Sequence, residues 1–109
     1  MKHGIIFCSD GSEEYWKEGK LHREDGPAIK YPNGSEYWYV EGKLHREDGP
    51  AVIMATGHKE YIIHGVSHRI DGPAIEYANG NKFWYYKGKL MNCDSQEEFE
   101  KLLKLKAFW

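Results

Sequence analysis

Apolar and polar positions recur along most of the chain with a period of 23 residues. The segment 19–28 reads Gly-Lys-Leu-His-Arg-Glu-Asp-Gly-Pro-Ala, segment 42–51 repeats it, and segment 65–74 carries a weakened copy. A fixed period of this length is typical of repeat proteins, in which each unit packs mainly on its neighbours. We therefore divide the chain into β-hairpin repeats over 1–92 and a separate C-terminal segment, 93–109. The expected repeats are 1–18, 19–41, 42–64 and 65–92.

Each repeat contains alternating strand-like segments between two kinds of turn signal. An Asp-Gly, Asn-Gly or Thr-Gly step recurs every 23 residues, and such steps between alternating segments predict a two-residue type I′ hairpin. A Gly-Pro step in each Arg-x-Asp-Gly-Pro segment predicts a second turn. The expected fold class is an all-β repeat, an elongated single-layer antiparallel β-meander of four hairpins. The eight predicted strands lie near 3–8, 12–18, 27–32, 35–41, 50–55, 58–64, 73–78 and 81–87.

A two-residue turn would fix which residues face each other across each hairpin. Aliphatic residues would then face aromatic ones on one side of the sheet, a combination that contributes about 0.2–1 kcal/mol per pair. These predicted pairs are Ile6/Tyr15, Ile29/Trp38, Val52/Tyr61 and Ile75/Trp84. The other side would hold Ile5/Trp16, Ala28/Tyr39, Ala51/Ile62 and Ala74/Tyr85. We expect this second side to leave an aromatic stripe partly open.

The pattern becomes helical after residue 92. The Ser-Gln-Glu-Glu segment at 95–98 has the form of a capping box, and apolar residues then follow at helical spacing. We predict a helix from about Ser95 to Lys106 that caps the last hairpin or folds under one sheet face. An unprotected edge strand invites association, and the first strand has no such cap. Its edge is therefore a candidate for pairing with a second copy in a homo-oligomer.

Composition excludes several function classes. Aromatic residues make up 15% of the chain, with 8 Tyr and 4 Trp, and such residues suit both pleated surfaces and binding faces. The net charge of −2 lacks the basic excess usual for nucleic-acid binding, so no nucleic-acid partner is expected. No stretch approaches the about 18 apolar residues of a membrane span, and no signal-peptide core precedes the first repeat. We expect a cytoplasmic protein.

The repeat resembles the MORN repeat. The matching segments are Tyr-Pro-Asn-Gly-Ser at 31–35, Tyr-Trp-Tyr at 37–39 and Glu-Gly-Lys-Leu-His at 41–45, and the resemblance covers about residues 3–92. Arg-x-Asp-Gly-Pro-Ala stands where the family usually has glycines after the His. This form is similar to the bacterial, phage and large-virus variant, so functions proposed for eukaryotic members, such as phospholipid binding, are not carried over. The resemblance implies a non-enzymatic, elongated sheet for protein–protein contact or self-assembly.

Repeated histidines and carboxylates raise the question of metal binding or catalysis. Residues His22, His45 and His68 form a column, but equivalent residues two strands apart lie about 9.5 Å from each other. Zinc ligands lie about 2 Å from the ion, so we expect no metal site and no cofactor. A flat sheet offers no cleft for paired catalytic carboxylates, and the sequence has no phosphate loop, Gly-x-Ser-x-Gly or Cys-x-x-Cys. We therefore expect no catalytic residues and no enzymatic activity.

The aromatic stripe and the repeated arginines are the remaining candidates for function. Tyr and Trp anchors with one or two Arg are the usual composition of interaction hot spots. The candidate partner-binding residues are Trp16, Tyr37, Tyr39, Tyr85, Arg23, Arg46 and Arg69. A structural interpretation of the arginines is that each supports its own turn or packs on an aromatic ring.

Three functions are compatible with these features. The first is a protein that binds another protein through its aromatic face; in a phage setting it would inhibit a host protein in the host cytoplasm. The second is a nucleotide or small-ligand binder that uses stacked aromatics and arginines. The third is a self-assembling structural module.

Overall fold

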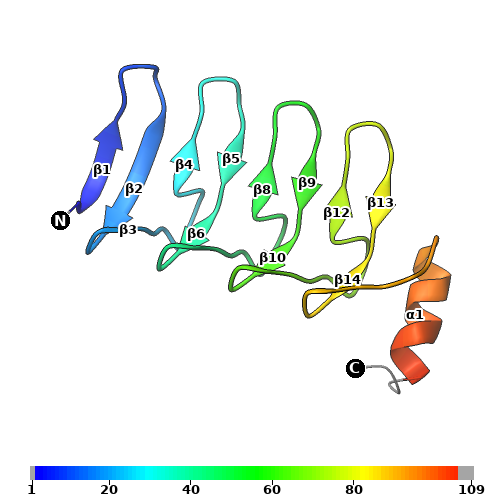
Figure 1. The fold of residues 1–109 in the computed structure, drawn as a ribbon. Coiled ribbons are helices and arrows are strands. Elements are labelled where there is room, and N and C mark those ends of the chain that lie inside the picture. The colour runs from blue at the N-terminus through cyan, green and yellow to red at the C-terminus, as the bar shows by residue number, and fades with distance from the viewer. Residues whose placement is uncertain (1, 106–109) are drawn as a thin grey trace.

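The described part of the protein is an elongated row of four upright β-hairpins with a helix at its C-terminal end (Figure 1). The computed structural model describes residues 2–105, which span 48 × 29 × 17 Å, so the predicted helix end at Lys106 lies outside the described part. The strands are β1 (Gly4–Phe7), β2 (Glu13–Lys17), β3 (Lys20–Leu21), β4 (Ile29–Lys30), β5 (Glu36–Tyr37), β6 (Tyr39–Val40), β7 (Lys43–Leu44), β8 (Val52–Ile53), β9 (Lys59–Glu60), β10 (Ile62–Ile63), β11 (Val66–Ser67), β12 (Ile75–Glu76), β13 (Lys82–Phe83), β14 (Tyr85–Tyr86) and β15 (Lys89–Leu90). The helix is α1 (Gln96–Leu105). The antiparallel hairpins with a capping helix confirm the predicted fold class.

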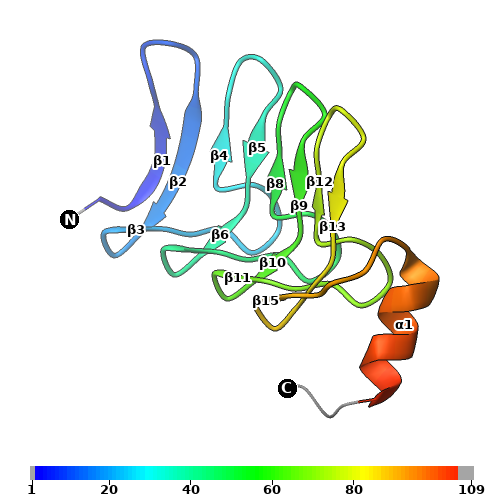
Figure 2. The ribbon, with the colours of Figure 1, turned by 45° about the vertical axis from the view of Figure 1, so that its right-hand side comes forward.

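The strands form one long sheet and a row of small hairpins beside it. In the described residues, the main sheet has the order β1-β2-β4-β5-β8-β9-β12-β13, and β3 also pairs with β2. The two-stranded sheets β6–β7, β10–β11 and β14–β15 follow the last three upright hairpins. Figure 2 shows these small hairpins lying across the lower ends of the upright ones. All neighbouring strands are antiparallel and follow the order of the chain, as expected for a meander.

The prediction of eight strands is wrong in detail, because the second strand of the second, third and fourth hairpins is divided. In the second repeat, β5 ends at Tyr37 and β6 begins at Tyr39. Trp38 lies at the division, where its N–H donates to the carbonyl of Ala51 in the next repeat at 2.7 Å. The lower segment then turns back on itself at Glu41 and Gly42, which have φ values of 50° and 79°. Two successive left-handed residues are the mark of a type I′ turn, so this turn lies beside Gly42 and not at Asn33.

The Asn-Gly steps form a different turn from the one predicted. The Gly34 N–H donates to the Tyr31 carbonyl, and the Tyr31 N–H donates to the Ser35 carbonyl, each at 3.0 Å. This is a three-residue loop: a type I turn with Pro32 at its first central position, followed by Gly34 in the left-handed region at φ 95°. The Asn33 side-chain oxygen also accepts a bond from the Ser35 N–H at 2.9 Å. Proline at that position favours a type I turn.

The longer loop shifts by one residue the predicted cross-strand pairs that contain Ile5, Ile6, Ile29, Val52 and Ile75. Ile29 faces Tyr37 instead of Trp38, and Ile5 faces Tyr15 instead of Trp16. A one-residue shift reverses which side chains share a sheet face. The remaining observed partners in the hairpins are Ile6/Glu14, Val52/Glu60 and Ile75/Phe83.

Helix α1 covers the last repeat, as predicted. Phe99 is fully buried in a cluster with Trp84 and Met91. The capping box is present in modified form: the Glu98 N–H donates to Ser95 Oγ at 3.2 Å, and the Glu98 carboxylate accepts from the Asp94 N–H at 3.3 Å. The helix therefore begins where the sequence indicates and closes the end of the repeat row.

Candidate protein-binding face

The histidine column joins successive repeats. The Nδ1 atom of His45 accepts a bond of 2.8 Å from the N–H of His64, which is the first left-handed residue of the next type I′ turn. His22 and His68 make the same bond to the next repeat, at 2.9 and 2.8 Å. The described residues contain no group of three or more His, Cys, Asp or Glu placed to hold a metal ion. The column thus supports the architecture by satisfying an amide that the turn leaves free.

This bond makes the stability of the last repeat junction depend on pH. His68 Nδ1 can accept a hydrogen bond only when it carries no proton, and burial, followed by the nearby Lys87 charge, lowers the pKa of His68 below its ordinary value of 6.5. The unfolded chain therefore binds a proton more readily than the folded one. We expect full stability above about pH 6.5, with a loss as the pH falls from there through the lower pKa of the folded protein. Denaturant unfolding between about pH 8 and pH 5 measures this loss.

The His68→Asn variant provides the matched control. The Asn side-chain oxygen can accept the Lys87 N–H bond but does not titrate in this range. We expect its unfolding midpoint to change less between the two pH limits than that of the original chain. An identical pH dependence in both proteins would show that His68 does not contribute to it.

Each repeated arginine is held by its own turn and by an aromatic ring of the preceding repeat. The Arg46 guanidinium carbon lies 3.8 Å from the centre of the Trp38 ring. Its Nε donates to Asp48 at 2.9 Å and lowers the pKa of that carboxyl, first by the hydrogen bond and then by its charge. A further guanidinium N–H donates to the Pro50 carbonyl at 3.2 Å. A Cβ at Gly49 would lie 2.9 Å from the guanidinium carbon, which explains the glycine.

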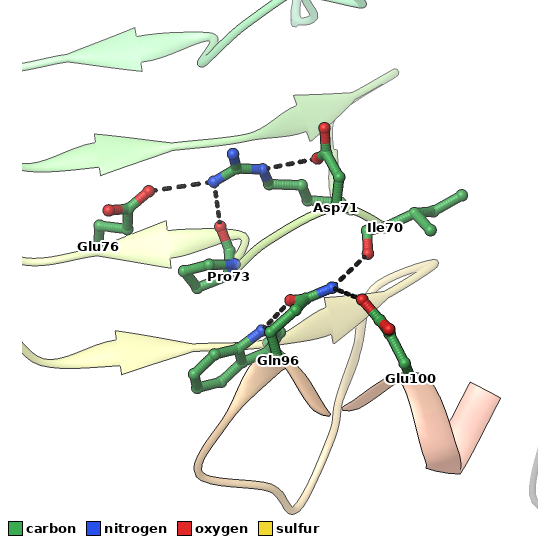
Figure 3. Close-up of polar contacts among 8 residues, drawn as sticks. Ile70, Asp71, Pro73, Glu76, Gln96 and Glu100 are labelled. Carbon is green, nitrogen blue, oxygen red and sulfur yellow. Dashed lines mark hydrogen bonds and ion pairs between the residues drawn. The ribbon is translucent and has the colours of Figure 1, made fainter. Parts of the chain in front are cut away.

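The other two arginines have the same surroundings. Arg23 stacks on Tyr15 at 4.0 Å and Arg69 on Tyr61 at 3.8 Å, and both bond to an Asp and to a proline carbonyl. Figure 3 shows the bonds around Arg69, which also include Glu76 at 3.1 Å. The ring stacking agrees with the structural interpretation of these residues. Their part in binding a partner stays a prediction.

The fourth repeat replaces the arginine with the helix. The position equivalent to Arg69 is Asn92, and the ring that an arginine would cover belongs to Trp84. Its indole N–H donates instead to the Gln96 side-chain oxygen at 2.8 Å. The Gln96 amide nitrogen donates to the Ile70 carbonyl at 3.0 Å and to Glu100 at 2.9 Å (Figure 3). Helix α1 thus takes the place of the next repeat.

The predicted aromatic residues share a sheet face with rings that were not among the predicted site residues. Tyr31 meets Tyr37 edge-to-face at 5.7 Å, and burial, together with these two tyrosines, raises the pKa of Tyr39. In the fourth repeat, Tyr77 meets Phe83 in the same way at 5.7 Å. We call this surface the aromatic face. It consists of Trp16, Tyr31, Tyr37, Tyr39, Tyr77, Phe83 and Tyr85.

The aromatic face is partly open. The exposed fractions of Tyr31, Tyr77 and Phe83 are 39%, 44% and 39%, whereas Trp16, Tyr37, Tyr39 and Tyr85 are half-buried. The predicted stripe is interrupted at Ile62, which is only 5% exposed. Tyr31 and Tyr77 were missed because the two-residue turn placed them on the opposite face, in the wrong register. Phe83 lay on the predicted face beside Tyr85 but was not among the candidate residues.

The arginines line grooves that are separate from the aromatic face. None of the residues of the aromatic face lines the two grooves in which Arg23, Arg46 and Arg69 lie. A groove of about 480 Å³ lies between successive arginine turns, and Arg23, Arg46 and Trp38 line it. Four carboxylates, each more than 80% exposed, also line this groove or its rim. They are Glu24, Asp25, Glu47 and Asp48.

Comparison with known proteins identifies no relative: no protein-family model and no curated protein matches the chain. The MORN resemblance therefore stays a prediction from the repeat pattern. Within residues 2–105, no helix is long and apolar enough to cross a membrane.

Proposed function

We propose that this chain is a non-enzymatic binding protein that engages a protein partner through its aromatic face. The observation that carries the proposal is the exposure of Tyr31, Tyr77 and Phe83. Tyr31 meets the half-buried Tyr37 edge-to-face, and Tyr77 and Phe83 meet each other in the same way. Exposed aromatic patches mark interaction sites, and Tyr side chains give large contact areas at a small entropic cost. These edge-to-face contacts hold the exposed rings in place before a partner arrives.

The position of the grooves favours a protein over a small ligand. Small-molecule sites are concave pockets with a few convergent polar groups. The grooves of about 480 and 560 Å³ are lined by residues outside the aromatic face. A broad ring-covered surface without these grooves suits a macromolecular partner.

The alternative of a nucleotide or other anionic ligand has one supporting observation. The groove between Arg23 and Arg46 brings two guanidinium groups and the Trp38 ring together. Each guanidinium is already bonded to an Asp and a carbonyl, and the exposed carboxylates around it repel an anion. A nucleotide that raises the melting temperature would support this alternative. We favour the protein partner.

The resemblance to the phage variant of the MORN repeat supports a more specific form of the proposal. A small repeat protein with no catalytic constellation can act by covering a functional surface of a larger protein. We therefore extend the proposal to an inhibitor of a host protein that works in the host cytoplasm.

Affinity capture from an extract of the cells in which the protein is naturally made tests the proposed face. The Tyr31→Ala and Tyr77→Ala variants remove exposed rings, and Ile70→Ala removes a more accessible apolar side chain outside the face, 57% exposed. We expect the original chain and Ile70→Ala to retain the same partner. Loss of a hot-spot ring costs about 2 kcal/mol or more of binding free energy, so at least one tyrosine variant should bind more than tenfold more weakly.

Circular dichroism of each variant separates loss of binding from loss of folding. The half-buried predicted residues are tested in the same way with Tyr39→Ala and Tyr85→Ala. If every folded tyrosine variant holds the partner as tightly as the original chain, the aromatic face is not the binding surface.

A further inference from the structure

The two ends of the repeat row are finished in different ways. At the C-terminal end, α1 buries Trp84 and Met91. At the N-terminal end, Lys2 and His3 imitate the Leu-His pair of a preceding repeat. The Gly19 N–H donates to the Lys2 carbonyl at 2.8 Å and the Glu18 N–H to His3 Nδ1 at 3.4 Å. These residues protect the lower part of the first repeat.

The upper part of the first repeat has no such protection. Strand β1 lies at the end of the main sheet and pairs only with β2 within the described residues. The Cys8 N–H donates to the Ser12 carbonyl. Because backbone groups alternate in direction along an antiparallel strand, Gly4 and Ile6 also face β2, whereas the N–H and C=O groups of Ile5 and Phe7 point outward. Figure 1 shows this open edge at the N-terminal end of the row.

Inside the row, backbone groups at the corresponding positions join one repeat to the preceding one, except for the Ala28 N–H, which donates to the Tyr37 carbonyl of its own hairpin at 2.9 Å. Ala28 is equivalent to Ile5, and its carbonyl accepts the Tyr15 N–H at 2.8 Å. Lys30 is equivalent to Phe7, and it pairs with Glu13 across the same junction. The edge of β1 therefore presents the groups that the chain uses elsewhere to bind a neighbouring antiparallel strand.

The side chains of β1 are also unlike those at equivalent positions. Ile5 and Phe7 are 49% and 73% exposed, whereas the residues equivalent to Ile5 are three fully buried alanines, at 28, 51 and 74. Natural edge strands are usually protected by charges, prolines or bulges. The edge of β1 instead carries two large apolar side chains, Ile5 and Phe7, at the residues whose backbone N–H and C=O groups point outward.

We propose that two copies of the chain pair through β1 to form a symmetric dimer with a continuous antiparallel sheet. Ile6 would lie beside Ile6 of the partner subunit at the two-fold axis. Ile5 would then exchange backbone hydrogen bonds with Phe7 of the partner subunit, and the reverse pair would form by symmetry. In this register, the outward-pointing N–H and C=O groups of Ile5 and Phe7 in each β1 all have hydrogen-bond partners. Each Ile5 side chain also gains an aromatic neighbour across the strands, a favourable pair.

The other end of the row gives the reason for a closed dimer and not a chain of copies. Head-to-tail assembly would place β1 of one copy against β13 of the next, in continuation of the repeat. Helix α1 already covers Trp84 and bonds to the Ile70 carbonyl through Gln96. It therefore occupies the space that the lower part of an added repeat would need. Pairing of β1 with β1 satisfies the free edge and closes the assembly.

Sedimentation velocity over a range of concentrations tests this inference on the full chain. We expect a species of twice the chain mass of 12.7 kDa. We expect Ile5→Lys and Phe7→Lys to return it to the monomer, because charge on an edge strand opposes pairing. The matched control is Ile70→Lys, which should remain a dimer. A monomer at every concentration, or growth beyond two copies, would overturn the proposal.

A disulfide test establishes the register independently of the lysine variants. In a background with Cys8→Ser and Cys93→Ser, Ile6→Cys would place two thiols at a non-hydrogen-bonded pair, whose Cα atoms lie about 4.5 Å apart. This distance is within the about 4.4–6.8 Å of disulfides. We expect mild oxidation to give a covalent dimer with Ile6→Cys and much less with Ile5→Cys. Equal or greater linkage through Ile5→Cys would refute the proposed pairing. The proposal does not depend on the aromatic face.

Discussion

Replacing Phe99 with alanine is expected to remove about 3–5 kcal/mol from the stability of the C-terminal end, the usual cost of truncating a fully buried phenylalanine. Phe99 is 0% exposed and packs with Trp84 and Met91, the two buried residues of the last repeat that the helix covers. A ten-residue helix such as α1 is marginal without tertiary contacts. Loss of this side chain should therefore detach the helix and leave the last repeat without its neighbour.

Urea unfolding followed by circular dichroism measures this effect, with Leu105→Ala as the control. Leu105 lies on the same helix but is 66% exposed, so its truncation should cost less than about 0.5 kcal/mol. Because repeats contact mainly their neighbours, the first two hairpins should keep their strand signal in Phe99→Ala. Equal losses from the two variants would show that α1 does not close the row in the way described.

Replacing Trp38 with alanine is expected to cost about 3 kcal/mol, the second largest effect. The Trp38 ring packs on the buried cluster of Ala51, Val52 and Ile62, and the Arg46 guanidinium lies 3.8 Å from the ring centre. Truncation removes the packing and leaves Arg46 without its aromatic partner, which contributes roughly 0.5–1 kcal/mol or more. Denaturant unfolding at neutral pH measures the loss.

The Trp38→Tyr variant tests whether the stability of the protein requires tryptophan at this position or only an aromatic ring. Tyrosine occupies the equivalent position in the first and third repeats, where Arg23 and Arg69 stack on Tyr15 and Tyr61. Within the described residues, the buried Trp38 indole N–H has no hydrogen-bond partner, and a buried unpaired donor carries an energetic cost. We expect Trp38→Tyr to change stability by less than about 1 kcal/mol. A loss as large as that of Trp38→Ala would show that the repeats are not equivalent at this position.

The repeat period and the helical pattern were sufficient to predict the architecture, but not the register. An Asn-Gly step is compatible with a two-residue type I′ turn and with a three-residue loop that ends on a left-handed glycine. Pro32 and the side-chain bond of Asn33 favour the longer loop. The true type I′ turns begin at Glu18, Glu41, His64 and Lys87, residues that rarely adopt positive φ. Only the glycine that follows each of them indicates such a turn in the sequence.

The candidate site was predicted only in part, because the register of the hairpins could not be predicted from the sequence. The rings of Tyr37, Tyr39 and Tyr85 could be chosen from composition and alternation. The exposed Tyr31 and Tyr77 could be assigned to the same face only with the correct loop length. The histidine bonds depend on a free amide that exists only after the type I′ turn has formed. Repetition of His in the sequence indicated importance, but it gave no information about the atom that each ring would meet.

Site-specific photo-crosslinking tests the binding proposal most directly. A photoreactive phenylalanine analogue at Tyr77, on the aromatic face, is compared with the same analogue at Ile70, which is 57% exposed and outside the face. We expect irradiation, in the cells in which the protein is naturally made, to join a protein to position 77, and we expect this adduct to be much weaker or absent at position 70. Adducts at position 70 alone, or none at position 77 from a folded protein, would contradict the binding proposal.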